Sequence, residues 1–262
     1  MYGWRGRIGL IVPSTNTTCE MEFHKVIPEG VSLHTARCFL REDSAPSDRI
    51  ESIAKMGGEL LEAAKCVASV EPGIVVWACT SGSFIKGKGY DTELIGVLEK
   101  VVKVSVITTS TAVLEAFKRL EVRNVAMVTP YIDEINLKEK RFFEDSMPGL
   151  RIVKMSGLGI LPNLPKGRLF PESAYLSAKE VNDNSSDSIF ISCTNWRTLE
   201  IIELLEKDLK KPVISSVQAT IWLAFKKLGL PSVEGYGQLL RKMDGRETQE
   251  DLRGSFERES KS

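Results

Sequence analysis

The sequence predicts an α/β fold built from two similar lobes, each with a parallel β-sheet. Short runs rich in Val and Ile alternate with longer segments of helical period, and the two halves of the chain can be laid over each other. The chain has 262 residues, enough for one compact domain or two small ones. Hydrophobic residues make up 42% of it, so a sizeable core can be buried.

The predicted strands are continuous apolar runs bounded by turn residues, which is typical of strands buried on both faces of a parallel sheet. The runs lie at residues 8–12, 31–36, 74–78, 104–108, 125–129, 150–155, 189–192 and 213–215, those at 31–36 and 150–155 being weaker. Amphipathic stretches predict helices at residues 52–70, 91–101, 111–120 and 197–208. The alternation predicts a doubly wound arrangement.

An internal repeat divides the chain into the two lobes. Residues 8–16 match 125–133, residues 74–84 match 188–198, and residues 103–117 match 211–225. Each matched pair combines a strand, a polar turn and the beginning of a helix, in the same order, which indicates duplication. We therefore expect a first lobe at residues 1–112 and a second at 113–216, followed by a charged, solvated tail at 241–262.

The balance of charge limits the class of protein. There are 35 basic and 35 acidic residues, whereas a protein that binds nucleic acid or a membrane surface usually carries a basic excess. The apolar run near the N-terminus ends at Pro13, which is too early for a signal peptide or a membrane span. We expect a cytoplasmic protein, and a homodimer.

The cysteines and histidines argue against a disulfide framework and a metal centre. Five cysteines stand far apart without a C-x-x-C pair, at positions 19, 38, 66, 79 and 193. The two histidines, His24 and His34, lie far in sequence from Cys79 and Cys193, so neither a zinc pattern nor a histidine-based triad is supported. No G-x-G-x-x-G opens the first helix; we expect no metal and no cofactor.

In open parallel sheets, ligands bind beyond the carboxyl ends of the strands. The residues predicted there are small, carry hydroxyl, amide or thiol groups, and include no lysine or arginine. They are residues 14–16, 79–81, 108–110, 131, 193–195 and 215–216.

Cys79 and Cys193 occupy equivalent places in the repeat, each followed by Thr and by an expected helix start. A free cysteine is usually a small buried hydrophobe, but two at matching positions favour a functional role. A helix N-terminus lowers a thiol pKa and attracts a carboxylate. Cys19, Cys38 and Cys66 lack this context; we interpret Cys19 as structural and expect Cys66 to pack within a helix.

For other polar residues, a structural role is an alternative to the functional one. Asn16 can cap the helix that follows it, and Asn163 in LPNLPKG can serve turn geometry. Residues 82–89, GSFIKGKG, lack a phosphate-loop pattern, and we expect a mobile flap over the pocket there.

Several short sequence segments, spread over nearly the whole chain, resemble segments of the maleate cis–trans isomerases of the aspartate/glutamate racemase superfamily. They are RIGLIVPSTNTTCE, CTSGSFIKGKGYD, TPYIDEIN, LGILPN, ISCTNWRTLEII and PVISSVQATIW. The resemblance implies two flavodoxin-like lobes with the active site between them, and residues 217–240 packing on the first lobe.

The resemblance also implies the site residues and their roles. Cys79 corresponds to the nucleophile and Cys193 to the proton donor. Contacts to the carboxylates of a small dicarboxylate substrate correspond to Asn16, Thr80, Ser81, Tyr131, Asn163, Thr194 and Asn195. Two departures stand out: Val217 replaces the family's asparagine before Gln218, and the tail beyond Gly237 has no counterpart.

Alternative activities share this scaffold. An amino-acid or hydantoin racemase would use the two thiols as opposed base and acid, and an enzyme of ectoine breakdown is a further candidate. Arylmalonate decarboxylase is disfavoured, because that relative lacks the thiol of the first half. A non-catalytic acid-binding protein would have unreactive thiols, and a Cys79–Cys193 disulfide is disfavoured because opposed pocket walls hold thiols apart.

Overall fold

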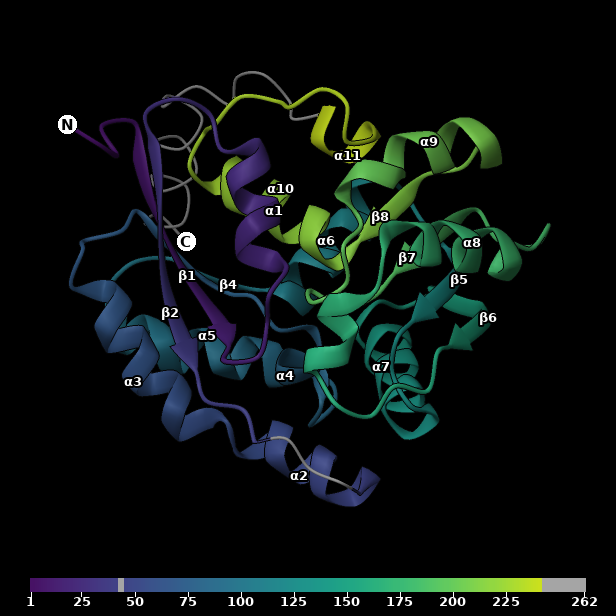
Figure 1. Ribbon diagram of the computed structural model, residues 1–262, viewed down its shortest axis with the longest axis horizontal. Coiled ribbons are helices and arrows are strands. Elements are labelled where there is room, and N and C mark those ends of the chain that lie inside the picture. The colour runs from purple at the N-terminus through teal and green to yellow at the C-terminus, as the bar shows by residue number, and fades with distance from the viewer. Residues whose placement is uncertain (42–44, 242–262) are drawn as a thin grey trace, which may run out of the picture.

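The computed structural model describes residues 1–41 and 45–241, and it contains two four-stranded parallel sheets with the orders β2-β1-β3-β4 and β6-β5-β7-β8 (Figure 1). The predicted α/β fold of two similar lobes is therefore confirmed. The first sheet comprises β1 (Gly6–Pro13), β2 (Val31–Cys38), β3 (Ile74–Trp77) and β4 (Val106–Thr108). The second comprises β5 (Asn124–Thr129), β6 (Arg151–Gly157), β7 (Ser188–Ile191) and β8 (Val213–Ser215).

The burial of each strand explains how strongly its pattern could be recognised. The two central strands of each sheet, β1 and β3 in one and β5 and β7 in the other, are almost wholly buried. The strands β2 and β6 lie at sheet edges and keep part of their side chains in contact with solvent. Their apolar runs are interrupted for that reason, and they are the two that gave the weaker signals.

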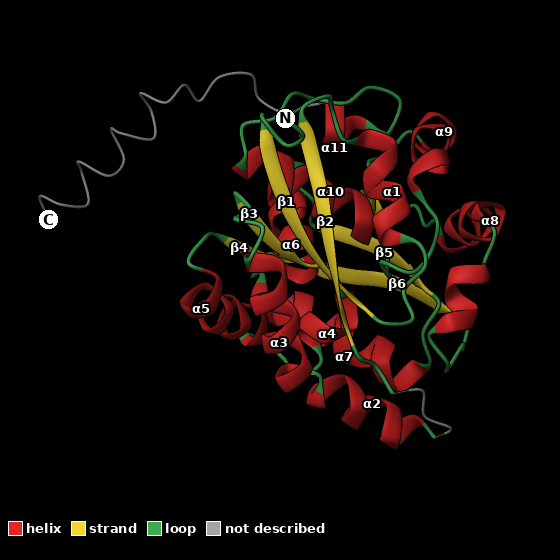
Figure 2. Ribbon diagram, turned by 60° about the vertical axis from the view of Figure 1, so that its left-hand side comes forward, coloured by secondary structure: helices red, strands yellow, loops and turns green. Residues whose placement is uncertain are grey.

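Helices cover both sheets (Figure 2). In the first lobe they are α1 (Cys19–Val26), α2 (Pro46–Lys55), α3 (Gly57–Ala68), α4 (Thr80–Phe84), α5 (Tyr90–Val102) and α6 (Thr109–Arg119). The later helices are α7 (Asp133–Ser146), η1 (Leu164–Arg168), α8 (Pro171–Val181), α9 (Leu199–Leu209), α10 (Ser216–Lys227) and α11 (Gln238–Arg241).

The helix expected at residues 52–70 is two helices, because the chain breaks at Met56 between α2 and α3. Gly57 and Gly58 follow the break, and glycine is a poor helix former. The break places the Met56 side chain beside Gly82 in α4, since a Cβ on Gly82 would meet the Met56 methyl group at 3.0 Å. The α2–α3 junction therefore covers the end of β3.

The strand register supports the duplication and corrects one of its three matches. Ile8 pairs with Ile74, and their counterparts Val125 and Ser188 pair in the same way. The gapless match of 103–117 with 211–225 is one residue out of register at its beginning, because the helix caps Thr108 and Ser215 are the equivalent residues. The helix α6 has 11 residues and α10 has 12, so the match holds only toward the ends of the helices.

The helices α6 and α10, which follow the last strand of each sheet, pack against each other between the lobes (Figure 1). α10 also contacts β3 and β4 of the first sheet. Within the described part of the chain, no helix is both long and apolar enough to cross a bilayer. The expected charged tail lies outside the described residues, except for Arg241.

Candidate active site

The two Cys-Thr motifs meet where the lobes face each other, and hydrogen bonds link them. The Thr194 hydroxyl donates to the Ala78 carbonyl at 3.0 Å, which joins the residue after Cys193 to the residue before Cys79. The Ser216 hydroxyl accepts from the Thr80 hydroxyl at 3.1 Å and from the backbone N–H of Cys193 at 3.0 Å. The carboxyl ends of β3 and β7 therefore form one site.

Cys79 is the N-cap of α4, so its thiol lies at the first turn of a helix. Its Sγ accepts a hydrogen bond from the Gly82 N–H at 3.2 Å and lies 3.9 Å from the Ser81 hydroxyl. Gly82 permits this approach, because a Cβ there would lie 2.8 Å from Cys79 Sγ and 2.9 Å from the Trp77 ring. The glycine and the cap together fix the position of the thiol.

Cys193 is held by a different backbone geometry. Its φ is +100°, in the region that non-glycine residues rarely adopt. The Asn195 N–H donates to Cys193 Sγ at 3.3 Å, and the Tyr131 hydroxyl forms a hydrogen bond with the same thiol. The expected helix start after Cys193 is wrong, because α9 begins only at Leu199 and a polar turn intervenes. Backbone strain and side-chain contacts position this thiol in place of a helix terminus.

The expected lowering of thiol pKa values is also wrong. Burial raises the pKa of Cys79 to about 11, although the bonds from Gly82 and Ser81 oppose the shift. Burial raises the pKa of Cys193 as well, against the Lys166 ammonium and the Tyr131 hydroxyl. Removal from water disfavours the thiolate more than the short helix favours it. Both thiols are protonated at neutral pH.

Two buried cations lie near the thiols, contrary to the expected absence of lysine and arginine. The Lys166 ammonium lies 5.2 Å from the centre of the Tyr131 ring and favours the Cys193 thiolate. Arg49, in α2, is only 2% exposed and favours the Cys79 thiolate. Neither residue follows a strand, which is why the strand-end criterion missed both. Together they make the site suited to an anion.

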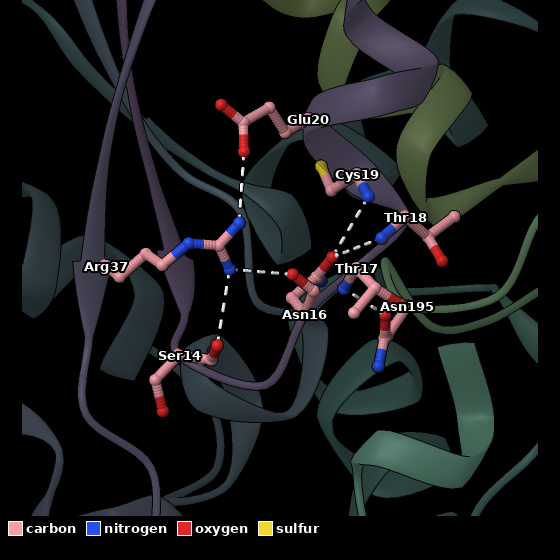
Figure 3. Close-up of polar contacts among 8 residues, drawn as sticks. All are labelled: Ser14, Asn16, Thr17, Thr18, Cys19, Glu20, Arg37 and Asn195. Atoms are coloured by element: carbon pink, nitrogen blue, oxygen red, sulfur yellow. Dashed lines mark hydrogen bonds and ion pairs between the residues drawn. The ribbon is translucent and has the colours of Figure 1, made fainter. Parts of the chain in front are cut away.

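Asn16 has the capping role considered for it (Figure 3), and it also contacts the other lobe. Its Oδ1 accepts from the N–H groups of Thr18 and Cys19 at 3.0 Å each, which caps the first turn of α1. Its Nδ2 donates to the Thr194 hydroxyl at 3.2 Å in the other lobe. Capping and contact between the lobes are therefore combined in one side chain.

Asn195 ties the same turn to the second lobe. Its Oδ1 accepts from the Thr17 N–H at 2.9 Å (Figure 3), and its Nδ2 donates to the Asn163 carbonyl at 2.9 Å. Asn163 in turn donates from Nδ2 to the Thr15 hydroxyl at 2.8 Å. All nine predicted site residues are buried and lie within this network or directly beside it.

Residues 82–89 do not form the single flap that the glycines suggested. Gly82, Ser83 and Phe84 belong to α4 and are buried, and the Ser83 hydroxyl donates to the carbonyls of Cys79 and Thr80. The helix start expected after Cys79 is therefore confirmed, but the helix extends into the residues that were assigned to the flap. Cys66, expected to pack inside α3, is exposed.

Two buried glutamates were not predicted from the sequence. Glu22 in α1 and Glu139 in α7 occupy equivalent positions of the repeat, and each has one carboxylate oxygen without a partner among the described residues. Burial raises the pKa of Glu22 to about 7 and that of Glu139 to about 8. The described residues include no group of three or more acidic, histidine or cysteine side chains arranged to hold a metal ion. The repeated spacing was the signal that could have revealed the pair.

Comparison with known proteins gives a consistent set of relatives. A family model described as arylmalonate decarboxylase matches residues 8–240. A maleate isomerase of Nocardia farcinica is 26% identical over 246 residues, which covers 90% of this chain and 95% of that protein. An arylmalonate decarboxylase of Bordetella bronchiseptica is 32% identical over 167 residues, which covers 61% of this chain and 68% of that protein.

The solved structures agree with the sequence matches. A mutant of the Nocardia farcinica maleate cis–trans isomerase, solved with a covalently bound succinylcysteine intermediate, aligns with a TM-score of 0.83 at 26% identity. The alignment covers 90% of this chain and 98% of that chain.

Proposed function

This chain belongs to the arylmalonate decarboxylase family, and from that membership we propose that it is a cofactor-independent isomerase that converts maleate to fumarate through a cysteine adduct. The family membership that the sequence segments predicted is confirmed, and the relatives are enzymes. These relatives include a decarboxylase as well as isomerases. The family is therefore shown, whereas the substrate and the reaction are what we propose.

The observation that carries the proposal is the pair of buried thiols at equivalent strand ends, joined across the lobes by the Thr194–Ala78 bond. Two thiols serve two roles in this reaction, one as nucleophile and one as proton donor. The presence of Cys79 separates this chain from a one-thiol decarboxylase. A covalent succinylcysteine has been captured in the isomerase relative, and the adduct proposed here is of the same kind.

The proposed addition balances as a thiol addition to an alkene. The S–H bond of Cys79 breaks as its sulfur bonds to one alkene carbon of maleate, and Cys193 protonates the neighbouring carbon. The proton lost by Cys79 passes to Cys193 and replaces the proton that Cys193 gave to the carbon. The former double bond is then single and rotates, after which the same steps run in reverse and release fumarate with both thiols restored.

The polar surroundings fit a substrate with two carboxylates. Hydroxyl and amide groups of both lobes surround the thiols, and we propose that Asn16, Thr80, Ser81, Tyr131, Asn163, Thr194 and Asn195 bind the carboxylates. Asn16 bonds to Thr194 across the lobes, and Asn195 bonds to the Asn163 carbonyl within the second lobe. Substrate binding exchanges such bonds for bonds to carboxylate. The positive charges of Lys166 and Arg49 offset the negative charge that develops beside a carboxylate during addition.

The test is an assay of purified protein with maleate and no added cofactor, which follows maleate loss and fumarate formation by NMR. We expect turnover in the wild type, and we expect Cys79→Ala and Cys193→Ala each to remove nearly all of it. A Cys193→Ser variant incubated with maleate should carry one added succinyl group on the peptide that contains Cys79. Near-wild-type turnover in either alanine variant would contradict the two-thiol mechanism.

The matching places of Cys79 and Cys193 at the ends of β3 and β7 favour a second candidate, an amino-acid or hydantoin racemase. That reaction also needs both thiols, but it exchanges the Cα proton and forms no adduct. Incubation with aspartate or a hydantoin in D2O separates the two, since only racemisation brings deuterium to Cα. Deuterium exchange without fumarate formation would replace the isomerase proposal by the racemase. The absence of both activities, with slow alkylation of both thiols, would indicate a non-catalytic acid-binding protein.

A further inference from the structure

Glu139 is a fully buried carboxyl group directly behind the Cys193 turn. It lies in α7, which packs against α4 and β6. Its Oε1 accepts a 2.6 Å hydrogen bond from the Ser192 hydroxyl, and its Oε2 has no partner among the described residues. An ionised carboxylate in this position would be costly, because one of its oxygens has no donor. The mechanism derived above does not use this group.

The bond from Ser192 connects Glu139 to the backbone that presents Cys193. Ser192 immediately precedes Cys193 and donates its own N–H to the Val128 carbonyl at 2.8 Å. The Ser192 side chain therefore connects α7 to the end of β7. The unusual φ of +100° begins at the next residue, Cys193, and a strained turn of this kind persists only when its neighbours hold it in place.

The groups that face Glu139 are those of the active site. Its negative charge disfavours ionisation of both Cys193 and Tyr131. The positive charge of Lys166 acts on the same thiol in the opposite direction. Of the other elements packed on α7, α4 and β7 have no titratable side chain, and Arg151 and Lys154 of β6 are exposed. The helix α6, which meets α7 through Phe117 and Phe143, carries Arg119 and an ion pair between Glu115 and Lys118.

We propose that Glu139 is a positioning residue for Cys193: through Ser192 it holds the turn that presents the thiol, and its charge controls how readily that thiol loses its proton. At neutral pH the carboxyl is protonated and serves as a neutral acceptor for Ser192. When it ionises, above about pH 8, its charge keeps Cys193 protonated, and so extends to alkaline pH the range in which Cys193 can act as an acid. The assignment of Cys193 as the acid rests on the proposed function, whereas the effect on the thiol does not.

The experiment uses Glu139→Gln, which keeps an oxygen for Ser192 and removes the charge, and Glu139→Leu, which removes both. The alkylation rate of Cys193 by iodoacetamide is measured against pH by mass spectrometry of its peptide, without substrate. We expect the midpoint to move down by about one pH unit in Glu139→Gln. The alkaline limb of kcat for maleate should move down equally, with KM nearly unchanged. Glu139→Leu should lose turnover at every pH, and Glu139→Gln should restore it near pH 7.

Glu22→Gln is the matched control, because Glu22 is equally buried and equivalent in the repeat. Its Oε1 accepts from the N–H groups of Thr198 and Leu199 instead of a hydroxyl beside the cysteine. This control should leave the Cys193 midpoint where it is in the wild type. If Glu139→Gln does not fold, Ser192→Ala removes the same bond, and it should lower kcat near pH 7.

An unchanged Cys193 midpoint in folded Glu139→Gln would overturn the role of the charge. An unchanged kcat in folded Glu139→Leu, or in Ser192→Ala where that replaces it, would overturn the positioning role. If instead the midpoint moves as expected while maleate is not turned over at all, the proposed function fails and the inference about Glu139 stands.

Discussion

The Ser216 hydroxyl lies 3.0 Å from the backbone nitrogen of Cys193 and accepts its N–H. Ser216 is the first residue of α10, and the same oxygen accepts the Thr80 hydroxyl at 3.1 Å. Both acceptor positions of this hydroxyl are therefore occupied. One hydroxyl from the helix between the lobes therefore links the two thiol motifs and holds the φ of +100° at Cys193.

Ser216→Ala is expected to lower kcat for maleate about 10–100-fold and to destabilise the chain by about 1–3 kcal/mol. The variant leaves a buried N–H without an acceptor and releases the Cys193 turn. Steady-state kinetics and urea unfolding measure the two effects. Thr109→Ala, at the equivalent first position of α6, is the control, because the Thr109 hydroxyl accepts from Thr220 and from no cysteine. Equal losses of kcat in both variants would argue against a specific role for Ser216.

Gly82→Ala is expected to reduce kcat about 100-fold while the chain still folds. The added methyl group would lie 2.8 Å from Cys79 Sγ, so the thiol must leave the position where it accepts the Gly82 N–H. Steady-state kinetics and circular dichroism provide the measurements. Gly96→Ala is the control, because a Cβ there meets nothing within 4 Å in the middle of α5, and it should keep full activity. Full activity in Gly82→Ala would show that the thiol position is not critical.

The layers and the two thiol motifs could be predicted because they depend on local signals. The buried strands β3 and β7 are short runs of apolar residues, and the polar turn after each one repeats with Cys and Thr in the same order. Pairing of Ile8 with Ile74, and of Val125 with Ser188, follows from that repetition. The edge strands β2 and β6 were harder to recognise, because solvent contact interrupts their apolar runs, whereas the edge strands β4 and β8 are buried.

The electrostatics could not be predicted, because they depend on what surrounds each group in three dimensions. A helix N-terminus beside Cys79 is visible in the sequence, but the burial that raises its pKa to about 11 is not. Lys166 stands in a Pro-rich loop that the sequence assigns to turn geometry, and only the fold brings it over the Tyr131 ring. The φ of +100° at Cys193 likewise has no local signal, since cysteine does not favour that region.

The stability of the chain is expected to fall as the pH rises from about 4.5 to about 7, in part because of Glu22. Burial raises its pKa from 4.5 to about 7 in the folded chain, so between these values the folded chain binds more protons than the unfolded chain. The free energy of unfolding must then decrease with pH, by up to about 1.4 kcal/mol per pH unit for one group, and level off above pH 7.

Glu22→Gln removes this ionisation while keeping an oxygen for the N–H groups of Thr198 and Leu199. Compared with wild type, the variant should therefore gain stability steadily from pH 5 to pH 7 and hold the gain at pH 8. Urea unfolding at each pH gives the difference, in which all other titrating groups cancel. A difference that stays constant from pH 5 to pH 8 would contradict the raised pKa of Glu22 in the folded chain.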